Sequence, residues 1–344
     1  MKKLPAFITG LVGILCFSQL ACQAWDYEGH RLVNQLALSS LPTNFPAFAK
    51  TPEARERIAF LAGEPDRWRN NSDLAHLNAP DHYIDLDDLP QFGIDEHALT
   101  HFRYDFTAQL ALARAAHPEK FPAIDPEQNR DHTRQLVGFL PWSIMENFNK
   151  LKSSFSYLKA FEKSGGTPEE IANAQADIVY IMGVMGHYVG DGAQPLHTTK
   201  HFNGWVGENP EHYTREKIHS HVDGYFRHLD TAGFQALKDR MHTARLPGEE
   251  PDAKPGDIFG QITTYILEQN TKVVPLYQLE KSGKLFGTGE SGVEGKAFLS
   301  KQLLAGGQML GDLWYAAWQQ ASEDTYLEGQ LARRKLPPGG SSKN

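Results

Sequence analysis

Residues 186–197 read GHYVGDGAQPLH. His187 and Asp191 are four residues apart, just over one helical turn, so their side chains point the same way from a helix. Pro195 then ends the helix, and the chain brings His197 round from a loop. Imidazole and carboxylate groups that converge on one point are typical ligands of a zinc ion. The stretch therefore predicts a helix with a metal site at its carboxyl end.

The residues that lead to this stretch are amphipathic at helical spacing. An apolar stripe over 168–190 consists of Ile178, Ile181, Met182, Met185 and Val189. The same periodicity predicts helices over five further ranges: 97–116, 131–164, 211–241, 256–281 and 296–321. Strand-like alternation is scarce, so we expect an all-α fold, a single domain of long packed helices over residues 25–330. The composition of 331–344 predicts a disordered tail.

Three glycines interrupt the helix before the metal motif. Gly183, Gly186 and Gly190 each cost ~1 kcal/mol relative to alanine in a helix interior. Two compatible gains explain them: close packing of a neighbouring helix, and room beside His187 for a metal ion and its other ligands.

The amino-terminal residues have the pattern of an export signal. Residues 1–24 carry two lysines, an apolar run and small residues before Trp25, which predicts a signal peptide cleaved after Ala24. Both cysteines, Cys16 and Cys22, lie inside it, so the mature chain would have no disulfide. A lipid-modified Cys22 is the alternative. We expect a secreted or periplasmic protein.

The charge of the chain is acidic. The formal net charge is −8, and it would become −10 on removal of Lys2 and Lys3 with the signal peptide. This balance argues against broad electrostatic capture of nucleic acid or anionic membrane. Any bound phosphate must meet local positive charge, which divalent metal ions would supply. The apolar run near the amino terminus is too short and interrupted for a good membrane span, and no obligate protein partner is indicated.

A second pair repeats the spacing of the first. His219 and Asp223 are again four residues apart on a predicted helix, whereas His221 would point to the opposite side. A lone His-x3-Asp pair is usually a surface hydrogen bond or a satisfied core pair. Two such pairs with His197 between them favour metal binding.

Further donors lie towards the amino terminus. PDHYIDLDD contains His82, and GEPDRWRN contains Asp66, for which a helix or turn cap is the alternative role. A free α-amino group at Trp25 would have a pKa of ~7.7–8.0 and could bind zinc together with its own carbonyl oxygen. His30 is near enough in sequence to share that ion.

Taken in order, these motifs resemble the three-zinc, single-strand-specific nucleases of the S-one/P-one type, which share a superfamily with the zinc-dependent phospholipases C. The motifs are an amino-terminal Trp, W-x4-H, D-x2-R, H-aromatic-x-D, H-x3-D-x5-H and H-x3-D, between Trp25 and Asp223. The resemblance implies a trinuclear zinc cleft in an all-helical domain. It also implies cleavage of single-stranded DNA and RNA to 5′-phosphate products, with 3′-nucleotidase activity.

The resemblance assigns nine residues to three zinc ions per chain. The first ion takes Asp66, His82, His187 and Asp191; the second takes the Trp25 amine and carbonyl, His30 and the bridging Asp191; the third takes His197, His219 and Asp223. A shared carboxylate suits two cations ~3.5–4 Å apart, and a site with three protein ligands leaves room for substrate.

The resemblance also assigns catalytic and substrate-binding roles. Asp66 and Asp191 belong to the catalytic centre, where Asp66 would orient the attacking hydroxide and Arg69 would bind phosphate. Tyr83 would stack on a base, and Asp85 would accept hydrogen bonds from it. The alternatives are a surface ion pair for Arg69 and a core position for Tyr83.

Two features separate the nuclease from the phospholipase branch. The short Trp25–His30 spacing and an aspartate at 223 favour a nuclease. A long insertion between His82 and His187 leaves a phospholipase C acting on phosphatidylcholine-like lipids as the alternative. The insertion includes residues 90–135 and ends near apolar side chains that would pack in the core or cover the cleft: Leu140, Trp142, Ile144, Met145 and Phe148. A metal-storage protein is a third possibility, against which the bridging ligand and the open third site argue.

Overall fold

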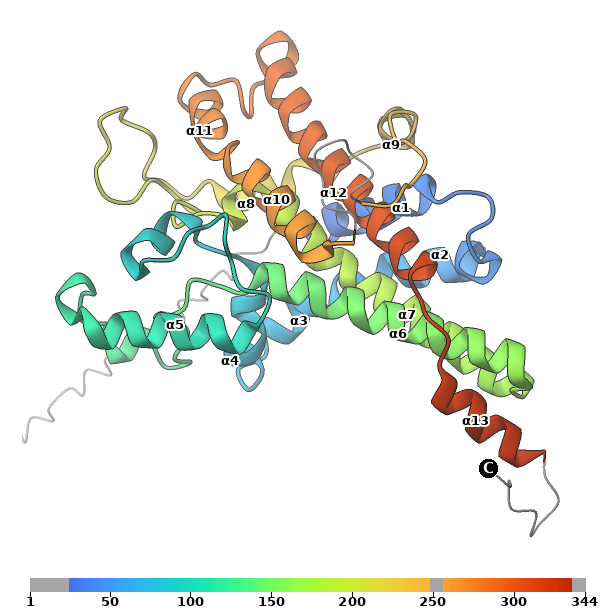
Figure 1. Cartoon of the computed structure of the whole chain (residues 1–344). Helices are drawn as coiled ribbons and strands as arrows, with labels where there is room; N and C mark the ends of the chain where they lie inside the picture. Colours follow the sequence, from blue (N-terminus) through green and yellow to red (C-terminus); the bar gives the residue numbers. More distant parts are fainter. Residues whose placement is uncertain (1–24, 248–255, 336–344) are drawn as a thin grey trace, which may run out of the picture.

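The structure is a computed structural model, and it describes residues 25–247 and 256–335. The expected signal peptide, residues 1–24, lies outside the described residues. Within those ranges the expected all-α fold is confirmed, since extended residues pair only in two isolated bridges. Figure 1 shows the helices as one packed body. The α-helices are α1 (Tyr27–Ser40), α2 (Pro52–Leu61), α3 (Glu64–Arg69), α4 (Ala75–Asn78), α5 (Arg103–Ala116), α6 (Leu140–Ser164), α7 (Pro168–Ala193), α8 (His219–Asp223), α9 (Thr231–Lys238), α10 (Ile258–Asn270), α11 (Val273–Lys281), α12 (Val293–Gln319) and α13 (Thr325–Arg334).

Short 3-10 helices connect these elements and complete two parts of the site. They are η1 (Ala47–Lys50), η2 (Ala79–His82), η3 (Leu86–Phe92), η4 (Pro118–Lys120), η5 (Pro126–Gln128), η6 (Pro195–His197), η7 (Gly224–Phe226) and η8 (Gly289–Gly292). In the described part of the chain, no helix is both long and apolar enough to cross a bilayer.

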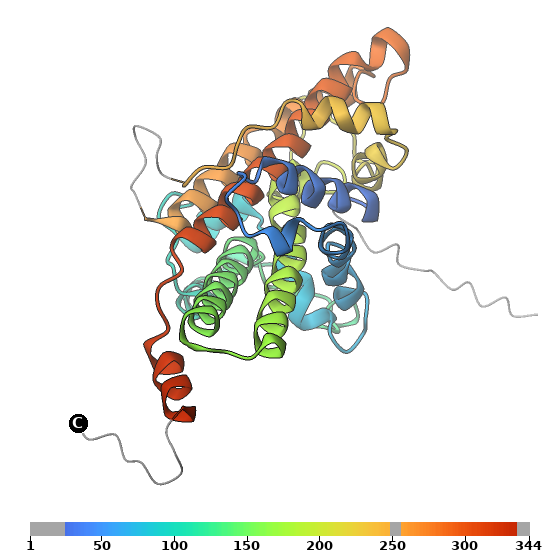
Figure 2. The ribbon, with the colours of Figure 1, turned by 90° about the vertical axis from the view of Figure 1, so that its right-hand side faces the viewer.

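Helix α7 is the central element of the fold. It begins with a capping box, in which Thr167 and Glu170 satisfy each other's backbone N–H groups, and it ends where Gln194 precedes Pro195. Helix α6 runs beside it, and α1, α2 and α12 pack on its other sides (Figures 1 and 2). The last twelve residues of α7 are therefore buried on every face.

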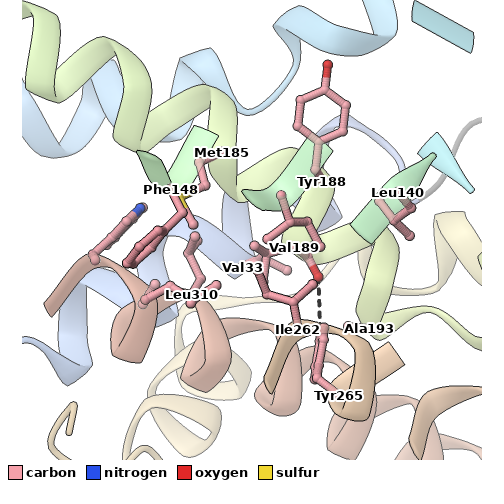
Figure 3. Packing of buried hydrophobic residues seen from close by; sticks show 14 of the residues in the cluster. Val33, Leu140, Phe148, Met185, Tyr188, Val189, Ala193, Ile262, Tyr265 and Leu310 are labelled. Carbon is pink, nitrogen blue, oxygen red and sulfur yellow. Dashed lines mark hydrogen bonds between the residues drawn. The ribbon is translucent and has the colours of Figure 1, made fainter. Parts of the chain in front are cut away.

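The core gathers around the carboxyl half of α7. In Figure 3, Val189 of this helix lies among side chains from α1, α6, α10 and α12. The hydroxyl of Tyr265 donates a 2.9 Å hydrogen bond to the Val189 carbonyl oxygen and so joins α10 to α7. Burial of each large apolar side chain contributes about 1.5–3 kcal/mol, so the element that carries the metal motif is also the most firmly packed.

Close packing explains two of the helix glycines. A Cβ atom at Gly186 would lie 1.6 Å from Oδ1 of Asn34, whose amide donates to the carbonyl oxygens of Ile58 and Gly183. A Cβ atom at Gly190 would lie 3.0 Å from Nδ1 of His30. The first glycine admits a neighbouring helix and the second admits a candidate metal ligand, so both expected gains are present.

Two expected helices begin later than predicted. The helix predicted over 97–116 begins at Arg103, because the side chains of Asp95 and Thr100 bond nearby backbone N–H groups and the Trp142 indole occupies the Thr100 carbonyl. The helix predicted over 131–164 begins at Leu140. Gly138 before it has a left-handed φ of 89°, and its backbone lies against Tyr83.

Three further boundaries were wrong. The range 211–241 contains the short helices α8 and α9 in place of one long helix, and 256–281 is divided between α10 and α11. The tail predicted from Leu331 begins too early, because α13 continues to Arg334 and buries Leu331 against the core. Residues 336–344 lie outside the described part of the chain.

Candidate metal centre

Three buried groups of histidine and aspartate side chains could hold metal ions. Within each group, one potential ligand atom per residue lies within 4.8 Å of the others. The groups are His30 with His187 and Asp191, Asp66 with His82 and His187, and His197 with His219 and Asp223. The first two share His187 and so form one double cluster. Every histidine and aspartate predicted as a ligand belongs to one of these groups.

Six elements bring these side chains together from across the chain. They are α1 with His30, α3 with Asp66, η2 with His82, α7 with His187 and Asp191, η6 with His197, and α8 with His219 and Asp223. Each His-x3-Asp pair lies on a helix as its spacing predicts. The convergence of the other elements depends on the tertiary fold.

Asp191 lies at the centre of the double cluster. Its Oδ1 is 3.5 Å from Nε2 of His30. Its Oδ2 is 3.0 Å from Nδ1 of His82 and 3.4 Å from Nε2 of His187. One oxygen therefore faces each group, which is the arrangement that a carboxylate shared by two ions requires.

Backbone carbonyl groups determine the tautomers of two histidines. Nδ1 of His187 is 2.6 Å from the Ala62 oxygen, and Nδ1 of His197 is 2.6 Å from the His82 oxygen. A carbonyl oxygen can only accept, so in both rings Nδ1 carries the proton and Nε2 keeps its lone pair. Those lone pairs face the clusters, as in metal sites where an acceptor bound to one ring nitrogen orients the other nitrogen towards the ion.

The electrostatics of the pocket favour a cation. Burial lowers the pKa of His187 and of His197 to about 3, so both rings stay neutral at pH 7. Burial also raises the pKa of Asp191 and of Asp223 well above the usual range of a carboxyl group. Positive charge supplied by a metal ion would reverse that rise.

Several buried nitrogen and oxygen atoms that could bind a metal ion have no hydrogen-bond partner. They are both ring nitrogens of His30, Nε2 of His82, Oδ1 of Asp191 and Oδ2 of Asp223. Polar atoms buried in this way are costly unless an ion or water satisfies them. The nitrogen and oxygen donors present therefore fit a divalent metal ion such as zinc.

Gln194 supports the third group and was not predicted as a site residue. Its side-chain oxygen accepts from the Leu196 N–H at 2.7 Å, which leaves its NH2 group to donate to Oδ1 of Asp223 at 3.0 Å. The sequence offered one signal, a polar residue between the ligand helix and Pro195. Its target on α8 depends on the fold.

Arg69 pairs with a candidate ligand. Its Nη2 lies 2.8 Å from Oδ1 of Asp66, and only 10% of the arginine side chain is exposed. The ion pair is therefore largely buried, unlike the surface pair considered as an alternative. The guanidinium also contributes to the lowered pKa values of the neighbouring His82 and His187, behind the larger effect of burial.

Trp25 lies between the two halves of the centre. Its buried indole donates at 3.0 Å to the carbonyl oxygen of Gly190, the residue before the candidate ligand Asp191. The backbone N–H of the next residue, Asp26, donates to the backbone carbonyl oxygen of Asp223 on α8 at 3.2 Å. The expected ligand role of the Trp25 amine depends on a cleavage site whose other side lies outside the described residues.

Tyr83 and Asp85 follow His82 on an extended segment, and both are partly exposed. The Tyr83 ring lies against Gly138, so it is neither a free platform nor a fully buried core residue. Partial burial and the carboxylates of Asp88 and Asp87 raise the pKa of Asp85 to about 8, and the ammonium group of Lys200 opposes this rise. The apolar side chains of Leu140, Trp142, Ile144 and Phe148 are buried in the core, which was one of the two roles expected for them, and they do not cover the cleft.

Comparison with known proteins yields no match, either to a protein-family model or to a curated protein sequence. The functional argument therefore rests on the geometry of the three groups and on the sequence motifs that form them.

Proposed function

We propose that this protein is a secreted zinc-dependent phosphodiesterase that cleaves single-stranded DNA and RNA to 5′-phosphate products and removes 3′-phosphates from nucleotides. The observation that carries the proposal is the triad of buried histidine and aspartate groups, two of which share His187 and face opposite oxygens of Asp191. Metal-storage sites have no need of such sharing, whereas hydrolases of phosphate esters use paired ions.

The nine expected ligands would hold three zinc ions. Asp66, His82 and His187 would hold one ion, with Asp191 shared between it and a second ion at His30 and the freed Trp25 amine. His197, His219 and Asp223 would hold the third. When bound, these ions would supply a water molecule acidified towards neutral pH and Lewis-acid polarisation of a phosphoryl oxygen.

The protein's own side chains would complete the chemistry. Asp66 accepts from Arg69, and its Oδ1 lies 3.8 Å from Nε2 of His187. These contacts support a role for Asp66 in orienting the attacking water. The Arg69 guanidinium lies beside this carboxylate, where it could bind a phosphate oxygen. Three divalent ions outweigh three carboxylates, so the loaded centre would attract an anionic substrate in spite of the chain's net negative charge.

The segment after His82 supports a nucleotide substrate. Tyr83 offers a partly exposed ring, and stacking on such a ring contributes about 1–3 kcal/mol per base. Bases within a duplex are already stacked, so single strands would be preferred. Asp85 is held three residues from the ligand His82, where it could form hydrogen bonds with the base edge.

One observation favours the phospholipase alternative. Large apolar side chains are exposed on and near α4 and α5: Leu77 at 58%, Phe102 at 69%, Tyr104 at 87% and Leu112 at 69%. Such side chains could contact lipid. They lie on the insertion and on α4, just before the segment that carries His82. The metal groups themselves are compatible with hydrolysis of either a nucleic acid or a phospholipid.

The deciding experiment compares three substrates with the purified mature protein: single-stranded DNA, duplex DNA and phosphatidylcholine, each with and without a chelator. We expect chelator-sensitive cleavage of single-stranded DNA, slower cleavage of the duplex, and 5′-phosphate ends on the products. Release of phosphocholine with intact single-stranded DNA would establish the lipid alternative. Metal content without turnover of any substrate would favour a storage protein.

A further inference from the structure

We propose that the insertion positions the metal-binding segment through Arg103, the first residue of α5. The ligand segment is defined here as residues 80–86, which carry His82, Tyr83 and Asp85. This inference rests on the proposed function for its consequences, although the contacts that carry it do not involve a metal ion.

The ligand segment lies between two strips of backbone. On one side, Ile84 and Leu86 donate to the carbonyl oxygens of His197 and Thr198 at 2.9 and 3.2 Å. On the other side, the segment exchanges three bonds with residues 137–140, where the insertion ends: Phe139 N to Pro80 O at 2.7 Å, Leu140 N to Tyr83 O at 3.2 Å, and Asp85 N to Val137 O at 2.7 Å. The position of His82 therefore depends on where the end of the insertion lies.

Arg103 joins the two parts of this arrangement. Its Nη2 lies 2.5 Å from Oδ1 of Asp81, the residue before the ligand His82. Its guanidinium carbon lies 4.4 Å from the centre of the Phe139 ring, and Phe139 is itself bonded to Pro80. One side chain thus contacts both the ligand segment and the strip that pairs with it.

Helix α5 is held firmly enough to act as a support. Phe106, one turn after Arg103, is fully buried and stacks on Trp142 of α6 with ring centres 4.3 Å apart. The Trp142 indole donates to the Thr100 carbonyl oxygen at 3.1 Å, just before the helix begins. The insertion is therefore anchored to the core on the side where Arg103 reaches the ligand segment.

The position of Arg103 is not explained by the stability of its own helix. It occupies the first turn of α5, where the helix dipole disfavours a cation, and no side chain caps this end. Its bond to Asp81 and its contact with Phe139 are the compensating interactions. A planar guanidinium suits both, because it can stack on a ring and donate to a carboxylate at once.

Arg103→Met tests this role, and Arg114→Met is a matched control. Arg114 lies on the same helix, over the rings of Phe121 and Phe92, and donates to the Gln135 carbonyl oxygen in place of a residue of the ligand segment. Two readouts apply to both variants and the wild type: hydrogen exchange of the amides of Ile84 and Asp85 in metal-free protein, and zinc retained under graded chelator.

We expect Arg103→Met to exchange these two amides at least about tenfold faster and to bind zinc about 10–100-fold more weakly, as loss of an outer-shell partner does. Arg114→Met should match the wild type in both. Arg103→Lys should restore part of the slow exchange and of the zinc affinity of the wild type. Unchanged exchange in Arg103→Met, or equal effects in both methionine variants, would overturn the inference. Faster exchange in Arg103→Met with no zinc in the wild type would support the positioning role and reject the proposed function.

Discussion

The carboxamide of Gln194 shows how one side chain can orient a candidate metal ligand. Its oxygen accepts from the Leu196 N–H, so its NH2 group must face Oδ1 of Asp223. The other oxygen, Oδ2, is left buried without a hydrogen-bond partner, while Oδ1 also lies 3.4 Å from Nε2 of His219 in the third group. Gln194 therefore presents the carboxylate in one orientation.

Gln194→Glu should weaken zinc binding at the third group by about 10–100-fold, because it sets a carboxylate against a carboxylate in place of an N–H donor. Zinc content after dialysis, with turnover of a nucleotide substrate, measures this. Gln308→Glu is the matched control, since the Gln308 carboxamide on α12 likewise accepts from a backbone N–H, that of His242, and donates to a carboxylate, that of Asp312. A full zinc complement in Gln194→Glu would contradict the assignment.

The raised pKa of Asp85 predicts a pH dependence of stability. A pKa of about 8 means that the folded protein binds this proton more tightly than the unfolded chain, whose aspartate titrates near ~3.9. The stabilisation is complete below that lower value and is lost as the pH rises through about 8.

Asp85→Asn removes this titration. The thermal midpoint of metal-free Asp85→Asn should therefore rise relative to wild type between about pH 5 and pH 8 and then level off. Asp73→Asn, at an exposed position in the turn before α4, is the control. A constant difference across that range would show that the Asp85 carboxyl is not perturbed by its surroundings.

At the scale of elements, α7 combines packing with chemistry on one helix. The face that carries His187 and Asp191 is continuous with the glycines that admit α1 and α2. A helix this closely surrounded cannot shift without moving both ligands, so the spacing of the double cluster is coupled to the core.

Gly186→Ala tests this coupling. The new Cβ atom would lie 1.6 Å from Oδ1 of Asn34, so we expect the free energy of unfolding to fall by about 1–3 kcal/mol or more in spite of the better helix propensity of alanine. Gly329→Ala on α13, where nothing lies within 4 Å, should instead raise it by about 0.5–1 kcal/mol. Denaturant unfolding measures both, and a neutral Gly186→Ala would show that α1 can move away freely.

For the whole molecule, the proposed ions would be part of the fold. Eight buried candidate ligands, all histidine or aspartate, converge from six elements, and no apolar contact could replace a cation among them. Their binding free energy would then add directly to the stability of the native state.

Removal of metal should therefore lower the thermal midpoint strongly. At a free concentration one hundred times the Kd, each ion adds about 2.7 kcal/mol, and each kcal/mol is worth about 2–4 °C in a large domain. For three ions we expect a fall of about 15–30 °C on treatment with a chelator, reversed by added zinc. Calorimetry with and without chelator measures it, and an unchanged midpoint would exclude structural metal ions.

Local patterns were sufficient for much of the site. The spacing of His187 with Asp191 and of His219 with Asp223 lies within one helical turn, so it places each pair on one face whatever the rest of the chain does. Amphipathic periodicity likewise determined that the chain is all-α, because it reports burial of one helix face. Helix ends were less predictable, since α5 begins only after Thr100, whose carbonyl oxygen accepts a hydrogen bond from the Trp142 indole.

Only the tertiary structure decided how the local pieces meet. The two oxygens of Asp191 face different histidines because α1 and η2 approach α7 from different sides. The tautomers of His187 and His197 depend on carbonyl groups distant in sequence, at Ala62 and His82. Hydrogen bonds between distant segments leave no periodic trace in a sequence, whereas spacing along one helix does. That difference is why the sequence determined the candidate ligands and the fold determined their arrangement.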